Sequence, residues 1–139
     1  MRAVLDANVL ISSAISQDGA PARLVRAWRG GHFDLIVSPR LMAEMERALG
    51  YRKVRAHIDA DEARALLDRL ARNAELTPDP EDPAPMHSPD PGDDYLIALA
   101  ASEDCFLVTG DSALLALRHH APILTPVEFL ELLDDDRPG

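Results

Sequence analysis

Residues 2–15, RAVLDANVLISSAI, predict a buried strand that passes directly into a helix. The apolar run of the strand ends at Asp6. From Val9 to Ile15 the apolar residues recur three and four positions apart, which is the period of a helix. A short, continuously apolar strand followed by a helix is typical of a parallel sheet with helices on its faces. This stretch therefore predicts the first strand–helix unit of an α/β fold.

The same alternation continues along the chain. Further strands are predicted at residues 33–37, 75–77, 106–109 and 123–124, and further helices at 21–29, 38–50, 59–73, 93–103, 111–118 and 125–133. Residues 78–92 contain six of the eleven prolines and are expected to form a loop, because proline removes a backbone donor and breaks regular elements. The alternation predicts a parallel sheet that is covered on both faces.

Length and composition fit one domain. The chain has 139 residues, of which 47% are hydrophobic and 27% are charged, and this excludes disordered, collagen-like and disulfide-rich classes. We expect one domain over residues 1–133 and a polar tail over 134–139. The single cysteine, Cys105, indicates a reducing compartment. Because there is no signal-peptide pattern and no apolar run of membrane-spanning length, we expect a cytoplasmic protein.

The charge of the chain is unevenly distributed. The net charge is −10, but residues 1–73 carry +3 and residues 74–139 carry −13. A strong negative charge argues against non-specific binding to nucleic acid, which depends on Lys and Arg. Eleven of the fourteen basic residues lie between Arg23 and Arg72, however, so one basic surface remains possible.

Four acids follow four predicted strands. Asp6 ends the first strand, Glu44 lies in the helix after the second, Asp93 begins the helix after the third, and Asp111 follows the fourth. The carboxyl ends of parallel strands meet at one edge of a sheet, where functional groups collect. Four uncompensated carboxylates would repel one another, and oxygen ligands favour Mg²⁺ or Mn²⁺. The pattern predicts a metal site that activates water for attack on a phosphodiester.

Each acid also has a plain structural interpretation. Asp6, Asn8, Asp93 and Asp111 are suited to the first turns of helices, and Glu44 taken alone is best read as a solvated helix residue. The occurrence of four acids after four strands favours the site over these separate interpretations.

Three motifs resemble those of PIN-domain nucleases, and most closely the VapC-like toxins of type II toxin–antitoxin modules. They are VLDANVLISS at 4–13, SPRLMAEMERAL at 38–49 and DPGDDYLIALAASEDCFLVTGDSALLAL at 90–117. The resemblance implies a metal-dependent endoribonuclease on an α/β/α sandwich, usually a homodimer that a partner antitoxin inhibits. It implies that Asp6, Glu44, Asp93 and Asp111 hold one or two Mg²⁺ ions, with Asn8 and Thr109 as orienting groups.

Several residues are candidates for binding or supporting roles. Asp93 shares a helix face with the apolar residues Leu96 and Ile97, so it is expected to be the metal ligand and Asp94 an auxiliary group. Among the aromatic residues that can stack on bases, Trp28 is expected in the core, while Tyr51 and Tyr95 stay open. The expected RNA path follows the basic residues near Glu44, which are Arg40, Arg47, Arg52, Lys53 and Arg55.

Three competing functions were weighed against RNA hydrolysis. A phosphotransferase with Asp6 as nucleophile ranks low because Asn8 stands where a general acid is needed. A receiver domain fails because it needs a late lysine, and the only lysine is Lys53. A catalytically silent or regulatory module that binds metal or nucleic acid stays open as the alternative.

Overall fold

The described part of the chain forms one five-stranded parallel sheet. The structure is a computed structural model that describes residues 1–82, 84–89 and 91–135. The strand order is β3-β2-β1-β4-β5, and every neighbouring pair is parallel. The strands are β1 (Arg2–Leu5), β2 (Asp34–Val37), β3 (Glu75–Leu76), β4 (Phe106–Val108) and β5 (Ile123–Leu124).

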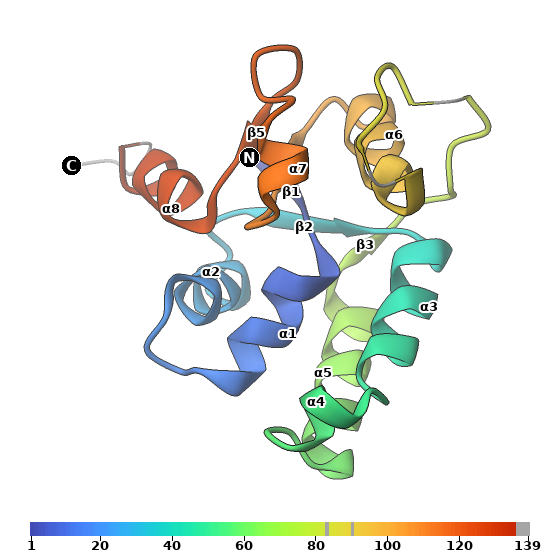
Figure 1. The fold of residues 1–139 in the computed structure, drawn as a ribbon. Helices are drawn as coiled ribbons and strands as arrows, with labels where there is room; N and C mark the ends of the chain where they lie inside the picture. Colours follow the sequence, from blue (N-terminus) through green and yellow to red (C-terminus); the bar gives the residue numbers. More distant parts are fainter. Residues whose placement is uncertain (83, 90, 136–139) are drawn as a thin grey trace.

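Helices cover both faces of this sheet, which confirms the predicted three-layer α/β/α sandwich. In Figure 1, α6 lies above β2 and β3, and α1 to α5 lie below them. The helices are α1 (Ala7–Ile15), α2 (Ala20–Arg29), α3 (Pro39–Ala48), α4 (Arg52–Arg55), α5 (Ala60–Asn73), α6 (Asp94–Ser102), α7 (Ser112–Leu115) and α8 (Pro126–Asp135), with a 3₁₀ turn at Pro91–Asp93.

The central strand β1 is the most deeply buried element and fixes the position of Asp6. Ala3, Val4 and Leu5 have no exposed surface, because helices cover both sides of β1. In register, Leu5 of β1 lies opposite Val108 of β4. The amide of Asp6 continues this ladder by donating to the carbonyl of Val108 at 3.0 Å. The carboxyl ends of β1 and β4 therefore meet, as the sequence predicted.

Several predicted boundaries were wrong. The helix expected over 38–50 ends at Ala48, and the short helix α4 after it was not predicted. The helix expected from Asp93 begins one residue later, after the 3₁₀ turn that Pro91 starts. The helix expected over 111–118 ends at Leu115, because the next residues form tight turns that lead to β5. Helix α8 extends to Asp135 and takes in the first two residues of the expected tail, whose residues 136–139 lie outside the described residues.

The core is aliphatic with a small aromatic contact. Phe33 and Phe129 meet edge to face with ring centroids 5.1 Å apart. Trp28 is buried, as the sequence predicted, and Cys105 is buried as well. Within the described residues, no helix combines the length and the apolar character needed to cross a membrane.

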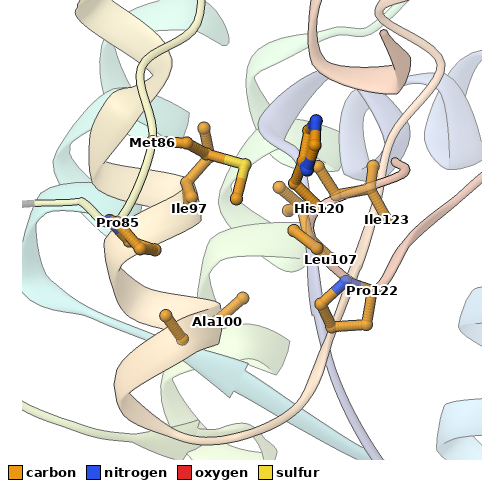
Figure 2. Close-up of a pocket in the computed structure, with 10 residues that line it drawn as sticks. Pro85, Met86, Ile97, Ala100, Leu107, His120, Pro122 and Ile123 are labelled. Atoms are coloured by element: carbon orange, nitrogen blue, oxygen red, sulfur yellow. The ribbon is translucent and has the colours of Figure 1, made fainter. Parts of the chain in front are cut away.

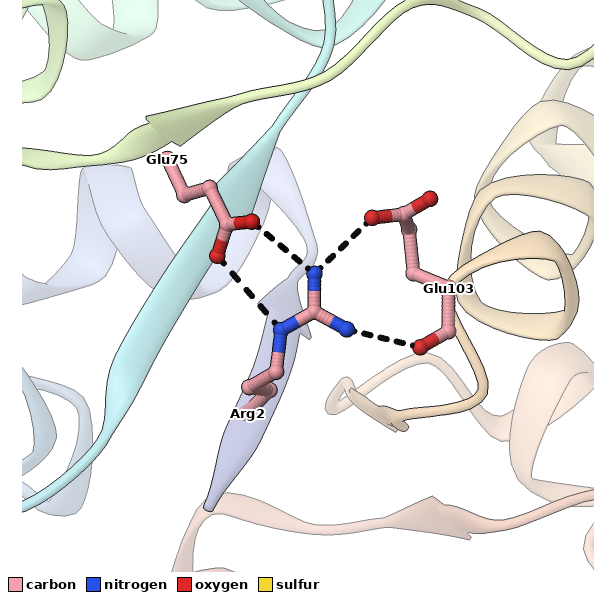
Figure 3. Close-up of polar contacts among 3 residues, drawn as sticks. All are labelled: Arg2, Glu75 and Glu103. Carbon is pink, nitrogen blue, oxygen red and sulfur yellow. Dashed lines mark hydrogen bonds and ion pairs between the residues drawn. The ribbon is translucent and has the colours of Figure 1, made fainter.

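An arginine at the amino end of β1 joins three elements (Figure 3). The Arg2 guanidinium contacts the Glu75 carboxylate of β3 at 3.1 Å and the Glu103 carboxylate at the end of α6 at 2.8 Å. It also donates to the Glu103 carbonyl at 2.9 Å. This arrangement lies at the edge of the sheet opposite to Asp6, so it stabilises the fold without approaching the acids.

Candidate active site

Asp6 is a buried carboxylate at the point where β1 passes into α1. It caps α1: one carboxylate oxygen accepts the Asn8 amide hydrogen at 3.2 Å. The other oxygen accepts the Thr109 hydroxyl at 2.8 Å. Thr109 follows β4, so the pairing of the two central strands brings these residues together from positions 103 apart in the sequence.

The surroundings of Asp6 disfavour its negative charge. Burial raises the pKa of its carboxyl, the hydrogen bonds from Thr109 and Asn8 lower that pKa, and the nearby charge of Asp111 raises it. The net direction is upward. A cation close to Asp6 would therefore stabilise the ionised carboxylate.

Three of the four predicted acids line one recess of about 270 Å³. Asp6 comes from the start of α1, Glu44 from α3, and Asp93 from the 3₁₀ turn before α6. The packing of α1 against α3 brings the first two of these elements together. Asn8 also lines this recess, as predicted from its position in the first motif.

Asp111 lies on the other side of Asn8. It caps α7 by accepting the Ala113 amide hydrogen at 2.9 Å, and its own amide donates to the Thr109 hydroxyl at 3.0 Å. Asp111 and Asn8 line a neighbouring recess of about 510 Å³. Thr109 thus connects Asp6 with Asp111, which explains why a small hydroxyl residue suits the position between them.

The donor chemistry of the four acids fits a divalent cation, but their side chains do not converge. The described residues contain no group of three or more Asp, Glu, His or Cys side chains arranged to hold a metal ion. Glu44 is paired with Arg47, one turn further along α3. The oxygens of Asp6 are directed at Thr109 and at the Asn8 amide. The four-acid metal site therefore stays a prediction.

Asp94 is directed away from the acids. Its carboxylate contacts His87 Nδ1 at 2.7 Å and accepts the Ser88 amide hydrogen at 2.7 Å. The hydrogen bond with His87 lowers the pKa of the Asp94 carboxyl. Asp94 therefore holds the proline-rich loop, which contains His87, against α6. The sequence did not predict this contact of His87.

The basic residues predicted for RNA binding occupy different positions. Arg47 lines the acid recess, and the Arg40 guanidinium lies 4.6 Å from the ring centroid of Tyr95. Arg55 donates to the Leu49 carbonyl at 2.8 Å, while Arg52 and Lys53 are exposed on α4. The i,i+3 spacing of Glu44 and Arg47 in the sequence is a signal for their pairing on one helix face.

Both tyrosines line the recess with the acids. Burial raises the pKa of Tyr95 to about 12, and the charges of Asp6 and Asp93 act in the same direction. Tyr95 therefore stays a neutral phenol at physiological pH. The sequence left both tyrosines as candidates for stacking on bases. Only the fold places them beside the acids.

Comparison with known proteins gave one finding about the family. A family model described as PIN domain matches residues 2–113. The match covers all four strand-following acids and ends two residues after Asp111. No curated protein matches the chain.

Proposed function

The chain belongs to the PIN-domain family of nucleases, and on this basis we propose that it is a metal-dependent endoribonuclease. Asp6, Glu44, Asp93 and Asp111 would hold Mg²⁺ or Mn²⁺. The observation that supports this best is the recess in which buried Asp6 lies with Glu44 and Asp93. PIN domains generally use divalent metal ions, which agrees with an all-oxygen donor set.

The electrostatics of the recess suit cation-dependent chemistry. Asp6 lies in surroundings that raise its pKa, so its ionised form needs a positive partner. When bound, a divalent cation would neutralise the scissile phosphate and activate water for the attack. Such a cation would also offset the repulsion between a phosphodiester and this acidic chain.

The other polar residues of the site would orient its acids. The Thr109 hydroxyl and the backbone N–H of Asn8 each donate to one oxygen of Asp6, which limits the rotation of its carboxylate. Arg47 pairs with Glu44 and places a guanidinium in the recess, where it would contact a substrate phosphate.

The RNA would approach along α3 and α4. Arg40, Arg47, Arg52, Lys53 and Arg55 lie on these two helices. Each phosphate contact to single-stranded nucleic acid contributes about 0.7 to the slope of log K against log salt concentration. Reversing the charge at both Arg52 and Lys53 should weaken RNA binding and reduce this slope by about 1.4. Unchanged slopes would place the path elsewhere.

The biological setting is proposed from the resemblance to VapC-like toxins. It comprises a cytoplasmic homodimer that a cognate antitoxin inhibits. A small open reading frame directly upstream that encodes a DNA-binding protein would support it. Co-expression of that protein should suppress cleavage, and light scattering should give the mass of two chains. Without such a neighbour, a role in RNA processing is the better explanation.

The decisive experiment compares two adjacent carboxylates. Cleavage of a single-stranded RNA is measured with Mg²⁺ or Mn²⁺ and with excess EDTA, for the wild type, Asp93→Asn and Asp94→Asn. Asp93 lines the recess, whereas Asp94 contacts the proline-rich loop. We expect Asp93→Asn to abolish cleavage and weaken metal binding measured by calorimetry, and Asp94→Asn to keep most of the activity.

Two controls separate this proposal from its alternatives. Asp6→Asn, purified in the same way, detects contaminating nuclease. Single-stranded DNA of the same sequence tests the preference for RNA. Cleavage that persists in EDTA would overturn metal dependence. Metal and RNA binding without any cleavage would identify the chain as a catalytically silent module.

A further inference from the structure

The recess that contains the acids is lined by apolar and aromatic residues as well. Asp6, Glu44 and Asp93 line it, and Ile11, Ala48 and Val54 are also among its lining residues. Tyr51 lines the same recess. A phosphate-binding region that adjoins an apolar and aromatic surface matches the chemistry of a nucleotide, whose charged phosphate and flat base need different surroundings.

Tyr51 is the aromatic side chain of this recess that is most open to a ligand. Its residue surface is 51% exposed, which leaves the ring accessible to a ligand. Trp28 is buried in the core, and Tyr95 is partly buried with the Arg40 guanidinium over its ring. The Tyr51 hydroxyl forms no hydrogen bond with the described part of the chain, so no polar contact there fixes its ring.

The backbone at Tyr51 is held on both sides. Its amide donates to the Ala48 carbonyl at 3.1 Å, and its carbonyl accepts from the amides of Val54 and Arg55 at 3.0 and 2.9 Å. The Arg55 side chain also bonds to the Leu49 carbonyl at 2.8 Å, which closes the turn between α3 and α4. A ring on such a fixed backbone loses little freedom when it binds a flat ligand.

Three basic residues lie near Tyr51 in the sequence or in the recess. Arg52 and Lys53 follow Tyr51 directly on α4, and Arg47 lines the recess with it. A basic surface with an exposed aromatic ring is the combination by which proteins bind single-stranded nucleic acid, since the cations contact phosphates and the ring stacks on a base.

We propose that Tyr51 stacks on the nucleobase of the nucleotide adjacent to the scissile phosphate. This inference rests on the proposed nuclease function and adds a binding site for one unpaired base. A base within a duplex is stacked on its neighbours, so this contact favours single-stranded substrate. Tyr51 thereby contributes to the specificity for single-stranded substrate, while the acids act in the hydrolysis of the phosphodiester.

The test combines changes in protein and substrate. A single-stranded RNA oligonucleotide is prepared with the natural base or with an abasic site at each position around the cleaved bond. Loss of one base–aromatic stack corresponds to roughly a 5- to 150-fold effect on binding. We expect Tyr51→Ala to lower kcat/KM by a factor in this range. One abasic position should cause a similar loss in the wild type and no further loss in Tyr51→Ala.

Two variants make the result specific to the ring. Tyr51→Phe retains the ring and should restore tight binding. Val127→Ala truncates another exposed apolar side chain, on α8 and outside the recess, and should bind RNA like the wild type. Circular dichroism checks that each variant is folded. Additive losses from Tyr51→Ala and the abasic site at every position would overturn the inference.

A binding measurement in EDTA separates this inference from the proposed function. Fluorescence anisotropy of labelled RNA needs no hydrolysis, so the comparison of Tyr51→Ala with the wild type remains valid if the chain does not cleave. Weaker binding by Tyr51→Ala without any cleavage would support the base site and refute the nuclease. Cleavage with equal binding by both proteins would refute the base site alone.

Discussion

Replacing Thr109 by valine tests how the central strands hold Asp6. The Thr109 hydroxyl is buried, donates to the Asp6 carboxylate at 2.8 Å and accepts the Asp111 amide hydrogen at 3.0 Å. Valine has nearly the same shape, so the substitution removes both hydrogen bonds without creating a large cavity. A hydrogen bond to a charged group is worth about 1.5–3 kcal/mol, and a neutral one about 0.5–1.5 kcal/mol. We expect the free energy of unfolding at pH 7 to fall by about 2–4 kcal/mol.

Thr77 offers a matched control for the same substitution. Its hydroxyl is also buried, but it has no hydrogen-bond partner in the described part of the chain. Replacing an unpaired buried hydroxyl by a methyl group removes a desolvation cost and leaves no partner unsatisfied. We therefore expect Thr77→Val to leave the free energy of unfolding unchanged or to raise it by up to about 1 kcal/mol.

Urea unfolding in EDTA measures both variants, since it excludes any contribution from bound metal. Thr109→Ser restores the hydroxyl and should recover most of the lost stability. The Thr109 bond lowers the pKa of Asp6. The cost of Thr109→Val should therefore shrink at acidic pH, where Asp6 is protonated and needs its donor less. Equal effects of Thr109→Val and Thr77→Val at pH 7 would show that the Thr109 hydrogen bonds do not stabilise the fold.

Three further predictions concern the metal-free protein. Burial raises the pKa of Asp6, so the native state binds the Asp6 proton more tightly than the unfolded state does. The free energy of unfolding should therefore fall as the pH rises through the native pKa of Asp6. Urea unfolding between pH 4 and 7 should show this fall for the wild type and not for Asp6→Asn. Burial raises the pKa of Cys105 to about 11, so a thiol reagent should label it slowly in the native protein and rapidly in guanidinium chloride. Both Glu103 and Glu75 contact Arg2, and the side chain of Glu103 is 23% exposed against 49% for Glu75. Glu103→Gln should therefore lower the melting temperature more than Glu75→Gln. Salt at 0.5 M should weaken the Arg2–Glu75 pair more than the Arg2–Glu103 pair.

The local features of the fold were available in the sequence because they depend on neighbouring residues. Apolar runs predicted the strands. The helix predicted from residue 38 begins there, since the Ser38 hydroxyl caps α3 by accepting the Leu41 amide hydrogen. The prediction failed at α4 and at the end of α7. At these places short turns continue a helical pattern, and periodicity does not distinguish a turn from one more turn of helix.

The sequence by itself determined that acids follow the strands, since position after a strand is a property of the chain order. Parallel pairing then dictates that these acids gather at one edge of the sheet. In the structure Asp6, Glu44 and Asp93 line one recess and Asp111 lines a neighbouring one, while their role as metal ligands stays a prediction.

Only the tertiary structure decided what each side chain contacts, because these contacts join residues that are distant in sequence. Thr109 reaches Asp6 across 103 positions through the pairing of β1 and β4. Asp94, the first residue of α6, contacts the proline-rich loop, whereas Asp93 in the 3₁₀ turn before it lines the acid recess. Tyr51 lines the recess together with the acids because it lies in the turn between α3 and α4. The periodicity of a sequence predicts which face of a helix or strand a side chain occupies. The residues that this side chain contacts depend on how the helices and strands pack together.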